Sequence, residues 1–224
     1  MRTLLPLLLA ALAPPVQAAD RDHPAVVELY QSQGCSSCPP ADLAVNGIAG
    51  RPDVLALSFA VTYWDQLGWK DIFASPVFTK RQWDYARAGG RQNVATPQVI
   101  VNGRGAIVGS NRPEIDAAIA HFDRGTDGPV LAADGRLVTV GVGKGRATLW
   151  LVSYDPRTIP VAIRAGENGG RTIPHRNIVR RLVALGQWKG QPLRVLLPPV
   201  PANLRSALLL QAGKGGPIVA ARKL

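Results

Sequence analysis

The sequence GCSSCPP, residues 34–40, holds the only two cysteines of the 224-residue chain. The apolar run before it, residues 25–30, is typical of a buried strand, and residues 41–49 after it are typical of a helix. A Cys-x-x-Cys motif between a strand and a helix is the arrangement of a redox dithiol, because helix amides favour a thiolate and the second thiol can resolve a mixed disulfide. The motif therefore predicts a redox-active pair, Cys35 and Cys38.

The two cysteines have different expected roles. Cys35 stands at the loop end of the turn, so we expect it to be the more exposed sulfur and the nucleophile. Cys38 would lie one helical turn further in, where it resolves the mixed disulfide. The two serines between them supply hydroxyl donors and no cation, so the sequence does not indicate a strongly lowered thiol pKa.

Two prolines follow the motif directly. A proline disfavours helical geometry in the residue before it, so Cys38 and Pro39 are both expected to be extended. The regular helix would then begin near Pro40, and the amides of the turn would be free to face a sulfur anion.

Three other interpretations of the cysteine pair remain open. A structural zinc site needs about four ligands, and only His23, His121 and His175 could join the pair. A static disulfide would close a ring so small that it stabilises the fold little. A degenerate scaffold that only binds a partner is the third. The prediction is a site without metal or another cofactor.

The first 18 residues resemble a signal peptide. Met1-Arg2 gives a positive start, residues 4–12 are apolar, and cleavage is expected after Ala18. The apolar run is shorter than the roughly 20 residues of a membrane span, so we expect no integral membrane protein; an uncleaved anchor is the alternative. The mature chain is then expected in an oxidising compartment, as a periplasmic or secreted protein.

Charge is divided unevenly along the chain. Residues 20–129 carry 10 Lys and Arg against 12 Asp and Glu, a net charge of −2, whereas residues 130–224 carry 15 against 3, a net charge of +12. Such a division usually separates units with different surfaces. We therefore expect one domain over residues 20–124, a hinge over residues 125–129 and a second domain over residues 130–224.

Strands and helices alternate in the first of these units. A strand is expected at 54–59, a helix capped by Ser75 to about Ala88, and a strand at 97–101. Asn102-Gly103 is a hairpin signal before a strand at 106–108, and Asn111 caps a last helix. This order predicts a partly parallel sheet covered by helices.

The element order, with Cys-x-x-Cys after the first strand and Thr96-Pro97 before the hairpin, resembles the thioredoxin fold. In that superfamily a cis proline at this position lies against the dithiol, and the residue before it pairs with bound peptide. The resemblance implies that Pro97 is the cis proline and Thr96 a substrate-binding residue; X-Pro bonds permit the cis form, and an ordinary trans proline is the alternative.

A closer resemblance is to a bacterial secreted family, domain of unknown function 1223. It rests on residues 27–42, Tyr63-Trp64-Asp65, Leu67-Gly68-Trp69, Thr96-Pro97-Gln98 and Glu167-Asn168-Gly169-Gly170 with His175. The family is thioredoxin-like in its first part, and its substrate is unknown. The loop before His175 is a candidate for testing, although the resemblance gives it no role.

An aromatic segment follows the second expected strand. It covers residues 63–71 and comes where the carboxyl ends of parallel strands face the functional edge, so it could line a substrate pocket beside Cys35. Within it, Tyr63 and Trp64 are the candidate substrate-binding residues. Simple packing of an inserted loop explains them equally well.

The second unit is expected to be all-β, like a small sandwich, because short apolar runs alternate with Gly, Pro and Asn turns. The expected strands are residues 137–140, 148–152, 161–163, 177–179, 193–196, 207–210 and 218–220. Its positive charge could draw it to an anionic envelope surface or acidic partner, but the arginines are dispersed, and a solvated face is the simpler interpretation. Nucleic acid is not an expected partner of a secreted protein.

The sequence thus predicts a secreted or periplasmic α/β thioredoxin-like domain followed by a smaller all-β sandwich-like domain. Its expected activity is thiol–disulfide oxidoreduction on protein or small-molecule thiols and disulfides, carried by Cys35 and Cys38. The alternative is a non-catalytic thioredoxin-like binding module with a structural or vestigial disulfide.

Overall fold

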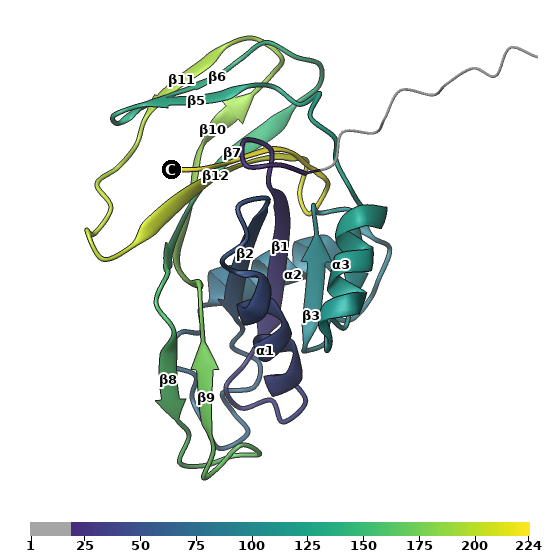
Figure 1. Ribbon diagram of the computed structural model, residues 1–224, viewed down its shortest axis with the longest axis vertical. Coiled ribbons are helices and arrows are strands. Elements are labelled where there is room, and N and C mark those ends of the chain that lie inside the picture. Colours follow the sequence, from purple (N-terminus) through teal and green to yellow (C-terminus); the bar gives the residue numbers. More distant parts are fainter. Residues whose placement is uncertain (1–18) are drawn as a thin grey trace, which may run out of the picture.

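The computed structural model describes residues 19–224, so the expected signal peptide lies outside the described residues. Within that part of the chain there are an eight-stranded, a three-stranded and a two-stranded sheet and three helices (Figure 1). The first half contains β1 (Ala25–Gln31), α1 (Pro39–Ile48), β2 (Val54–Ala60), α2 (Pro76–Ala88), β3 (Gln98–Val101), β4 (Gly105–Ile107) and α3 (Arg112–His121). The second half contains β5 (Leu131–Asp134), β6 (Leu137–Val140), β7 (Ala147–Asp155), β8 (Ile159–Ala162), β9 (Thr172–His175), β10 (Ile178–Trp188), β11 (Leu193–Leu196), β12 (Arg205–Ala212) and β13 (Ile218–Lys223).

The large sheet is mixed, with strand order β13-β12-β7-β10-β2-β1-β3-β4. β1 and β2 are parallel, whereas β3 runs antiparallel to β1. Every residue of β1 and β2 is buried, which is why both strands read as nearly continuous apolar runs. The alternation of strands and helices predicted a mixed α/β fold, and the structure confirms this class.

α2 and α3 each begin directly after a residue whose side chain caps the helix. The Ser75 hydroxyl accepts a hydrogen bond from the backbone of Val77 at the start of α2, and Asn111 accepts one from the backbone of Glu114 at the start of α3. α1 and α3 cover one face of β1, β2 and β3, and α2 packs against the other face (Figure 1). Both capped helices were predicted from the sequence.

Asn102 and Gly103 turn the chain between β3 and β4. Both have positive φ, 49° and 64°, a region that Asn and Gly enter more readily than other residues. The Asn102 side chain accepts a hydrogen bond from the backbone N–H of Val26 (2.8 Å) and donates one to the carbonyl of Phe122 (3.0 Å). The predicted hairpin is confirmed, and its turn is tied to β1 and to the end of α3.

The second half differs from the separate sandwich that we expected. β7, β10, β12 and β13 belong to the large sheet, in which β10 runs beside β2. At this junction the backbone N–H of Ser58 donates to the carbonyl of Asn177 (3.0 Å), and the Asn177 side chain donates to the carbonyl of Ala56 (2.8 Å). Local turn signals carry no information about a pairing between residues so distant in sequence.

β5, β6 and β11 form a second sheet, which packs on the C-terminal strands of the large one. Buried Val138, Leu149, Leu208 and Trp188 fill the space between the two. A sandwich-like layer is therefore present, but one of its sheets continues into the first half of the molecule.

The two halves share a hydrophobic core. Tyr30, Leu57 and Phe59 of β1 and β2 lie in one buried cluster with Val152 of β7 and Leu209 of β12. The expected hinge consequently does not separate two independent cores.

A buried ion pair of the first half also contacts the second half. The Arg81 guanidinium of α2 donates two hydrogen bonds to the Glu28 carboxylate of β1, at 2.9 and 2.7 Å. A third bond runs from Arg81 to the Gln211 side chain of β12 (2.9 Å), and Glu28 is fully buried. Each polar group of the pair thus has partners, as burial of charge requires.

The sequence underestimated the length of the longest strand, β10, by the widest margin. β10 extends over Ile178–Trp188, whereas a short strand at 177–179 was expected. Arginines interrupt its apolar pattern, and register shifts between Val179 and Arg181 and between Ala184 and Gly186 break the period-two alternation. β5 and β9 were not predicted at all.

Candidate functional site

The two cysteines form a disulfide at the start of α1. Their Cα atoms are 5.4 Å apart, and the backbone N–H of Cys38 donates to the carbonyl of Cys35 (3.2 Å). Cys38 has helical backbone angles, φ −77° and ψ −33°, and α1 begins at Pro39. The expectation of extended Cys38 and Pro39 was wrong, because the turn closed by the disulfide and this hydrogen bond outweighs the usual preference before proline.

Both cysteines are buried in this disulfide form. Cys35 and Cys38 each expose 0% of their surface, although Ser36 and Ser37 between them are exposed. The prediction of a more exposed Cys35 was therefore wrong here. The loop between β8 and β9, residues 163–171, contacts the cysteine turn, and we call it the covering loop.

The covering loop is bound to the cysteine turn by polar contacts. The buried Asn168 amide donates to the carbonyls of Gln33 (2.9 Å) and Cys35 (2.8 Å). The Glu167 carboxylate accepts bonds from the hydroxyl (2.7 Å) and the backbone N–H (3.1 Å) of Ser36. These bonds from the Ser36 side chain and then its backbone lower the pKa of Glu167 below its ordinary value.

Few backbone amides of the turn are left to face a sulfur anion. The Ser36 N–H is bonded to Glu167, the Cys38 N–H to the carbonyl of Cys35, and Pro39 and Pro40 have none. The expectation that these amides are free was wrong for Ser36 and Cys38, because the covering loop and the turn itself use them.

Thr96 and Pro97 lie beside the cysteine turn. Their peptide bond is cis, as the resemblance implied, and Pro97 is buried. The Ser37 hydroxyl lies 3.3 Å from the sulfur of Cys35 and 3.4 Å from the carbonyl oxygen of Thr96. A chain segment about 60 residues away in sequence thus contacts the turn directly.

Trp64 and Tyr63 both contact this neighbourhood, in different ways. The Trp64 indole N–H donates to the Thr96 hydroxyl (2.7 Å), and a β-carbon added at Gly34 would lie 3.6 Å from the Trp64 Cβ. The Tyr63 hydroxyl instead donates to the Gln82 side chain of α2 (3.2 Å), so Tyr63 is one contact further from the cysteines.

Gln33, Trp69 and Asp71 extend the site. Trp69 and Asp71 belong to the segment that was expected to line a pocket beside Cys35, but sequence reasoning assigned none of the three an individual role. The backbone N–H of Gln33 donates to the Asp71 carboxylate (2.8 Å), and the Trp69 indole donates to the Gln33 side chain (2.9 Å). Burial raises the pKa of Asp71 above its ordinary value, against the opposing effect of hydrogen bonds from Gln33 and Phe73.

Asp42 and His175 form a buried pair behind the disulfide. Asp42 stands one turn after Cys38 on α1, and its Oδ1 is 3.5 Å from Nδ1 of His175 on β9. Both residues are almost fully buried, and neither ring nitrogen of His175 has a hydrogen-bond partner among the described residues. Burial raises the pKa of Asp42, while the His175 interaction opposes the shift.

The missed residues differ in how visible they were. Glu167 and Asn168 stood out through the family resemblance, and His175 through the same resemblance and as a possible zinc ligand. Asp42 follows Cys38 by four residues, so helical spacing alone placed a carboxylate on the face that carries this cysteine. The contact of Asp71 with Gln33 gave no signal, because the two residues are distant in sequence.

The three histidines do not converge on the cysteines. His23 contacts Asp20, the ring of His121 lies against Phe122, and only His175 is near α1. Within residues 19–224, no group of three or more His, Cys, Asp and Glu side chains is placed to hold a metal ion. No helix in this range is long and apolar enough to span a membrane.

The fold and the site together define a mixed α/β protein with a Cys-x-x-Cys disulfide at the first turn of a helix, beside two parallel strands. The family model described as protein of unknown function (DUF1223) matches residues 26–211, and the chain belongs to this family. The family that the sequence resembles is therefore confirmed, and its description leaves the activity open.

Two solved structures are similar to this one. The crystal structure of protein AGR_C_4864 from Agrobacterium tumefaciens has 35% sequence identity and a TM-score of 0.76, over 93% of this chain and 95% of that one. HBP35 of Porphyromonas gingivalis has 11% identity and a TM-score of 0.60, over 93% of this chain and 76% of that one, a likeness of fold alone. None of the curated proteins compared with the chain matches it.

Proposed function

We propose that the chain is a thiol–disulfide oxidoreductase of thioredoxin-like fold, acting in the periplasm or outside the cell of a bacterium. The observation that carries the proposal is the Cys35–Cys38 disulfide at the first turn of α1, with Thr96 and the cis-Pro97 beside it. A disulfide in a chain with no other cysteine fits an oxidising compartment and the expected signal peptide.

The proposed reaction moves two electrons between the cysteine pair and a protein or small-molecule dithiol. A substrate thiolate attacks the sulfur of Cys35, the Cys35–Cys38 bond breaks, and Cys38 leaves as a thiolate that takes up a proton. The second substrate thiol then loses its proton and attacks the mixed disulfide, so that Cys35 leaves as a thiolate. The substrate is oxidised and the pair reduced; the reverse sequence reduces a substrate disulfide.

The surroundings of the sulfurs support moderate thiolate stabilisation. The hydroxyl of Ser37 can donate to a thiolate at Cys35, which lies 3.3 Å away in the disulfide form. Because the Ser36 and Cys38 amides are engaged and no cation among residues 19–224 is bonded to the turn, we expect a thiolate at Cys35 to be stabilised less than in strong oxidants.

Attack on Cys35 requires the covering loop to move. Its polar hold on the turn consists of the Asn168 bonds to Gln33 and Cys35 and the Glu167 bonds to Ser36. Hydrogen bonds of this kind contribute about 0.5–1.5 kcal/mol each, so opening is a modest local cost. We propose that Thr96 and Trp64 then form one wall of the substrate site, with Tyr63 behind them.

Complete burial of both sulfurs favours one other function, a non-catalytic binding module whose disulfide is structural. In that case the covering loop would stay closed and the pair would not exchange with thiols. The two candidates make opposite predictions for the chemistry of the cysteines.

The deciding experiment is equilibration of the mature protein with glutathione at a series of ratios, with reduced cysteine counted by alkylation and mass. A reversible two-electron transition, together with turnover of a model disulfide that Cys35→Ser abolishes, supports the oxidoreductase. Cys38→Ser is expected to accumulate a mixed disulfide at Cys35. A pair that stays oxidised over the whole series under native conditions would favour the binding module.

A further inference from the structure

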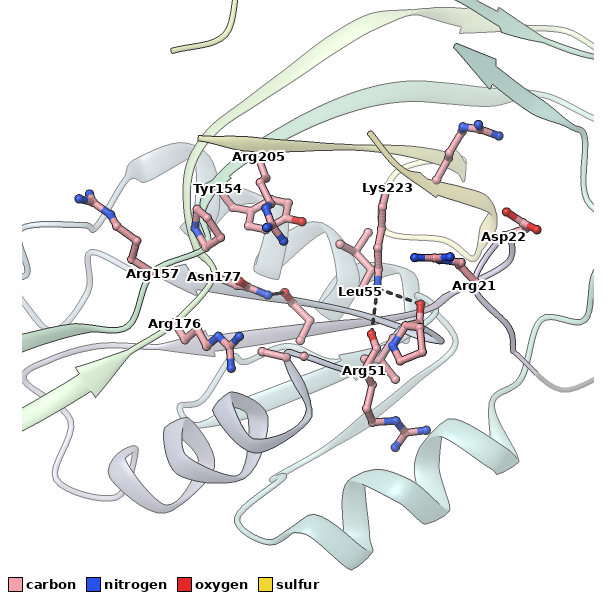
Figure 2. A pocket seen from close by; sticks show the side chains of 17 residues that line it. Arg21, Asp22, Arg51, Leu55, Tyr154, Arg157, Arg176, Asn177, Arg205 and Lys223 are labelled. Carbon is pink, nitrogen blue, oxygen red and sulfur yellow. Dashed lines mark hydrogen bonds between the residues drawn. The ribbon is translucent and has the colours of Figure 1, made fainter. Parts of the chain in front are cut away.

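A cavity of about 680 Å³ lies at the end of β1 and β2 opposite to the disulfide. Its walls come from the segment before β1, the α1–β2 connection, the β9–β10 connection, the start of β12 and the end of β13 (Figure 2). This volume is in the range of roughly 300–1,000 Å³ that is typical of small-molecule sites.

Positive charge dominates the lining. Seven arginine and lysine side chains line the cavity against a single carboxylate, Asp22, among the described residues. The C-terminal end of α1 at Ala49 also faces it, but a helix end supplies only about half a negative charge. The cavity therefore has a strong net positive charge.

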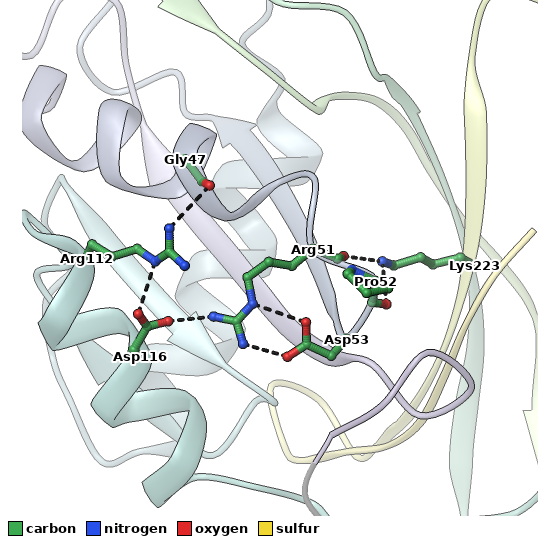
Figure 3. A network of polar contacts seen from close by, with 7 residues as sticks. All are labelled: Gly47, Arg51, Pro52, Asp53, Arg112, Asp116 and Lys223. Atoms are coloured by element: carbon green, nitrogen blue, oxygen red, sulfur yellow. Dashed lines mark hydrogen bonds and ion pairs between the residues drawn. The ribbon is translucent and has the colours of Figure 1, made fainter.

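Two of these seven cations already have carboxylate partners. Arg51 is bonded to Asp53 and to Asp116, within a network that also includes Arg112 at the α1–α3 contact (Figure 3). Arg157 pairs with Asp155, and its side chain points away from the cavity (Figure 2).

The other five cations form no ion pair among the described residues, and one of them, Arg222, donates to the carbonyl of Leu131 (3.0 Å). Arg21, Arg176 and Arg205 reach toward the middle of the cavity from three sides (Figure 2), and no hydrogen bond or ion pair of their side chains occurs within residues 19–224. Lys223 donates to the carbonyls of Arg51 and Pro52, both at 3.0 Å, which fixes the ammonium without neutralising it (Figure 3).

The charges are close enough to act on one another. Burial lowers the pKa of Lys223, Asp53 opposes this shift, and the charges of Arg21 and Arg205 lower the pKa further. Like charges gathered in one cavity repel, and an anion bound among them would relieve that repulsion.

We infer that this cavity binds a small soluble molecule that carries two or more phosphate or carboxylate groups. Planar guanidinium groups bind such oxyanions with paired hydrogen bonds, and Arg176 and Arg205 are the principal candidates for this contact. Lys223 keeps a third N–H for the ligand, because two of its three are bonded to carbonyls. The site is independent of the proposed redox function.

The cation arrangement favours a small ligand over a long polyanion. The lining cations come from elements far apart in sequence and converge on one concave space, instead of following a stripe across the surface. A polymer backbone would need such a stripe. The cavity lies at the amino ends of β1 and β2, whereas α/β proteins usually bind ligands at the carboxyl ends of their strands. Topology alone would therefore not indicate this site.

The test is isothermal titration of the mature protein with inorganic pyrophosphate and, separately, with citrate, at low and at physiological ionic strength. Vesicles that contain an anionic phospholipid form a third arm, which separates a lipid headgroup from a free anion. We expect a single site per chain for pyrophosphate or citrate, weaker at higher salt.

Three variants test the location. Arg176→Gln and Arg205→Gln should each weaken binding about tenfold, the loss expected for one charged hydrogen-bonding group. Gly50→Asp removes no arginine, but a β-carbon at Gly50 would lie 3.9 Å from Nη2 of Arg176, so the new carboxylate should occupy the site and block it. Arg194→Gln is the matched control, because this exposed arginine of β11 lies outside the cavity.

The results separate clearly. Binding that falls in the three cavity variants and stays within about twofold in Arg194→Gln supports the inference. Equal losses in all four variants would show only general attraction to a basic protein. Absence of binding by both anions, or binding to vesicles alone, would overturn the inference.

Discussion

The two ends of β1 and β2 carry opposite kinds of surface. At the carboxyl end the disulfide is buried, and the covering loop holds its turn through amide and carboxylate groups. At the amino end a cavity stays open, and its lining includes three arginines whose side chains have no partner among residues 19–224. α1 connects the two ends over about 15 Å, since Cys38 precedes its first residue and Ala49 follows its last.

Both ends depend on the second half of the chain. Glu167, Asn168 and His175 complete the disulfide end, whereas Arg176 and Arg205 complete the cationic end. The adjacent residues His175 and Arg176 therefore face different sites. The comparison teaches that neither site is a property of the first half of the chain alone, because each is closed by strands and loops from beyond residue 130.

The largest expected effect is that of removing the second half. A fragment of residues 20–124 would expose Tyr30, Leu57 and Phe59 and would leave the Glu28–Arg81 pair without Gln211. The charge division favours a folded fragment, but the shared core leads us to expect an unfolded one. Circular dichroism during thermal melting is the measurement. A cooperative transition in the fragment would show that residues 20–124 fold as an independent domain.

Arg81→Met tests the buried ion pair of α2 and β1, which also contacts the second half through Gln211. It leaves the Glu28 carboxylate buried with the Tyr30 and Tyr85 hydroxyls but without its cationic partner, so the free energy of unfolding should fall by about 3–5 kcal/mol in urea titrations. Lys80→Met is the control, because the exposed Lys80–Asp84 pair should contribute less than about 1 kcal/mol. Similar losses in both variants would contradict the importance of the buried pair.

Asn168→Ala tests the covering loop. The variant loses the two hydrogen bonds to Gln33 and Cys35, worth about 1 kcal/mol each, so reduction of the disulfide by a phosphine should be roughly tenfold faster or more. Arg164→Ala, an exposed change in the same loop, should leave the rate unchanged. An unaltered rate for Asn168→Ala would mean that the loop does not limit access.

The smallest expected effect is a pH dependence at Asp42. Burial raises the folded-state pKa of this carboxyl above the ordinary value of 3.8, while His175 opposes the shift. The stability that the protonated carboxyl provides is thus complete below 3.8 and is lost as pH rises through the raised pKa. Asp42→Asn should therefore gain stability relative to the wild type as pH rises, measured by urea unfolding at several pH values. A difference independent of pH would contradict the raised pKa.

Local sequence determined the elements around the disulfide. The apolar runs of β1 and β2, the capping residues Ser75 and Asn111, and the Asn102-Gly103 turn act within a few residues, so their structures follow from nearby side chains. The cysteine pair and the mixed α/β class were predicted for the same reason.

Only the tertiary structure decided what surrounds those elements. The pairing of β10 with β2, the burial of Cys35 under Asn168 and the convergence of Arg21, Arg176 and Arg205 each join residues more than 100 positions apart. Composition showed the excess of positive charge in the second half, but not that part of it faces a cavity beside the first. Such contacts depend on long-range strand pairing and on which side chains find partners, and neither leaves a periodic pattern in the sequence.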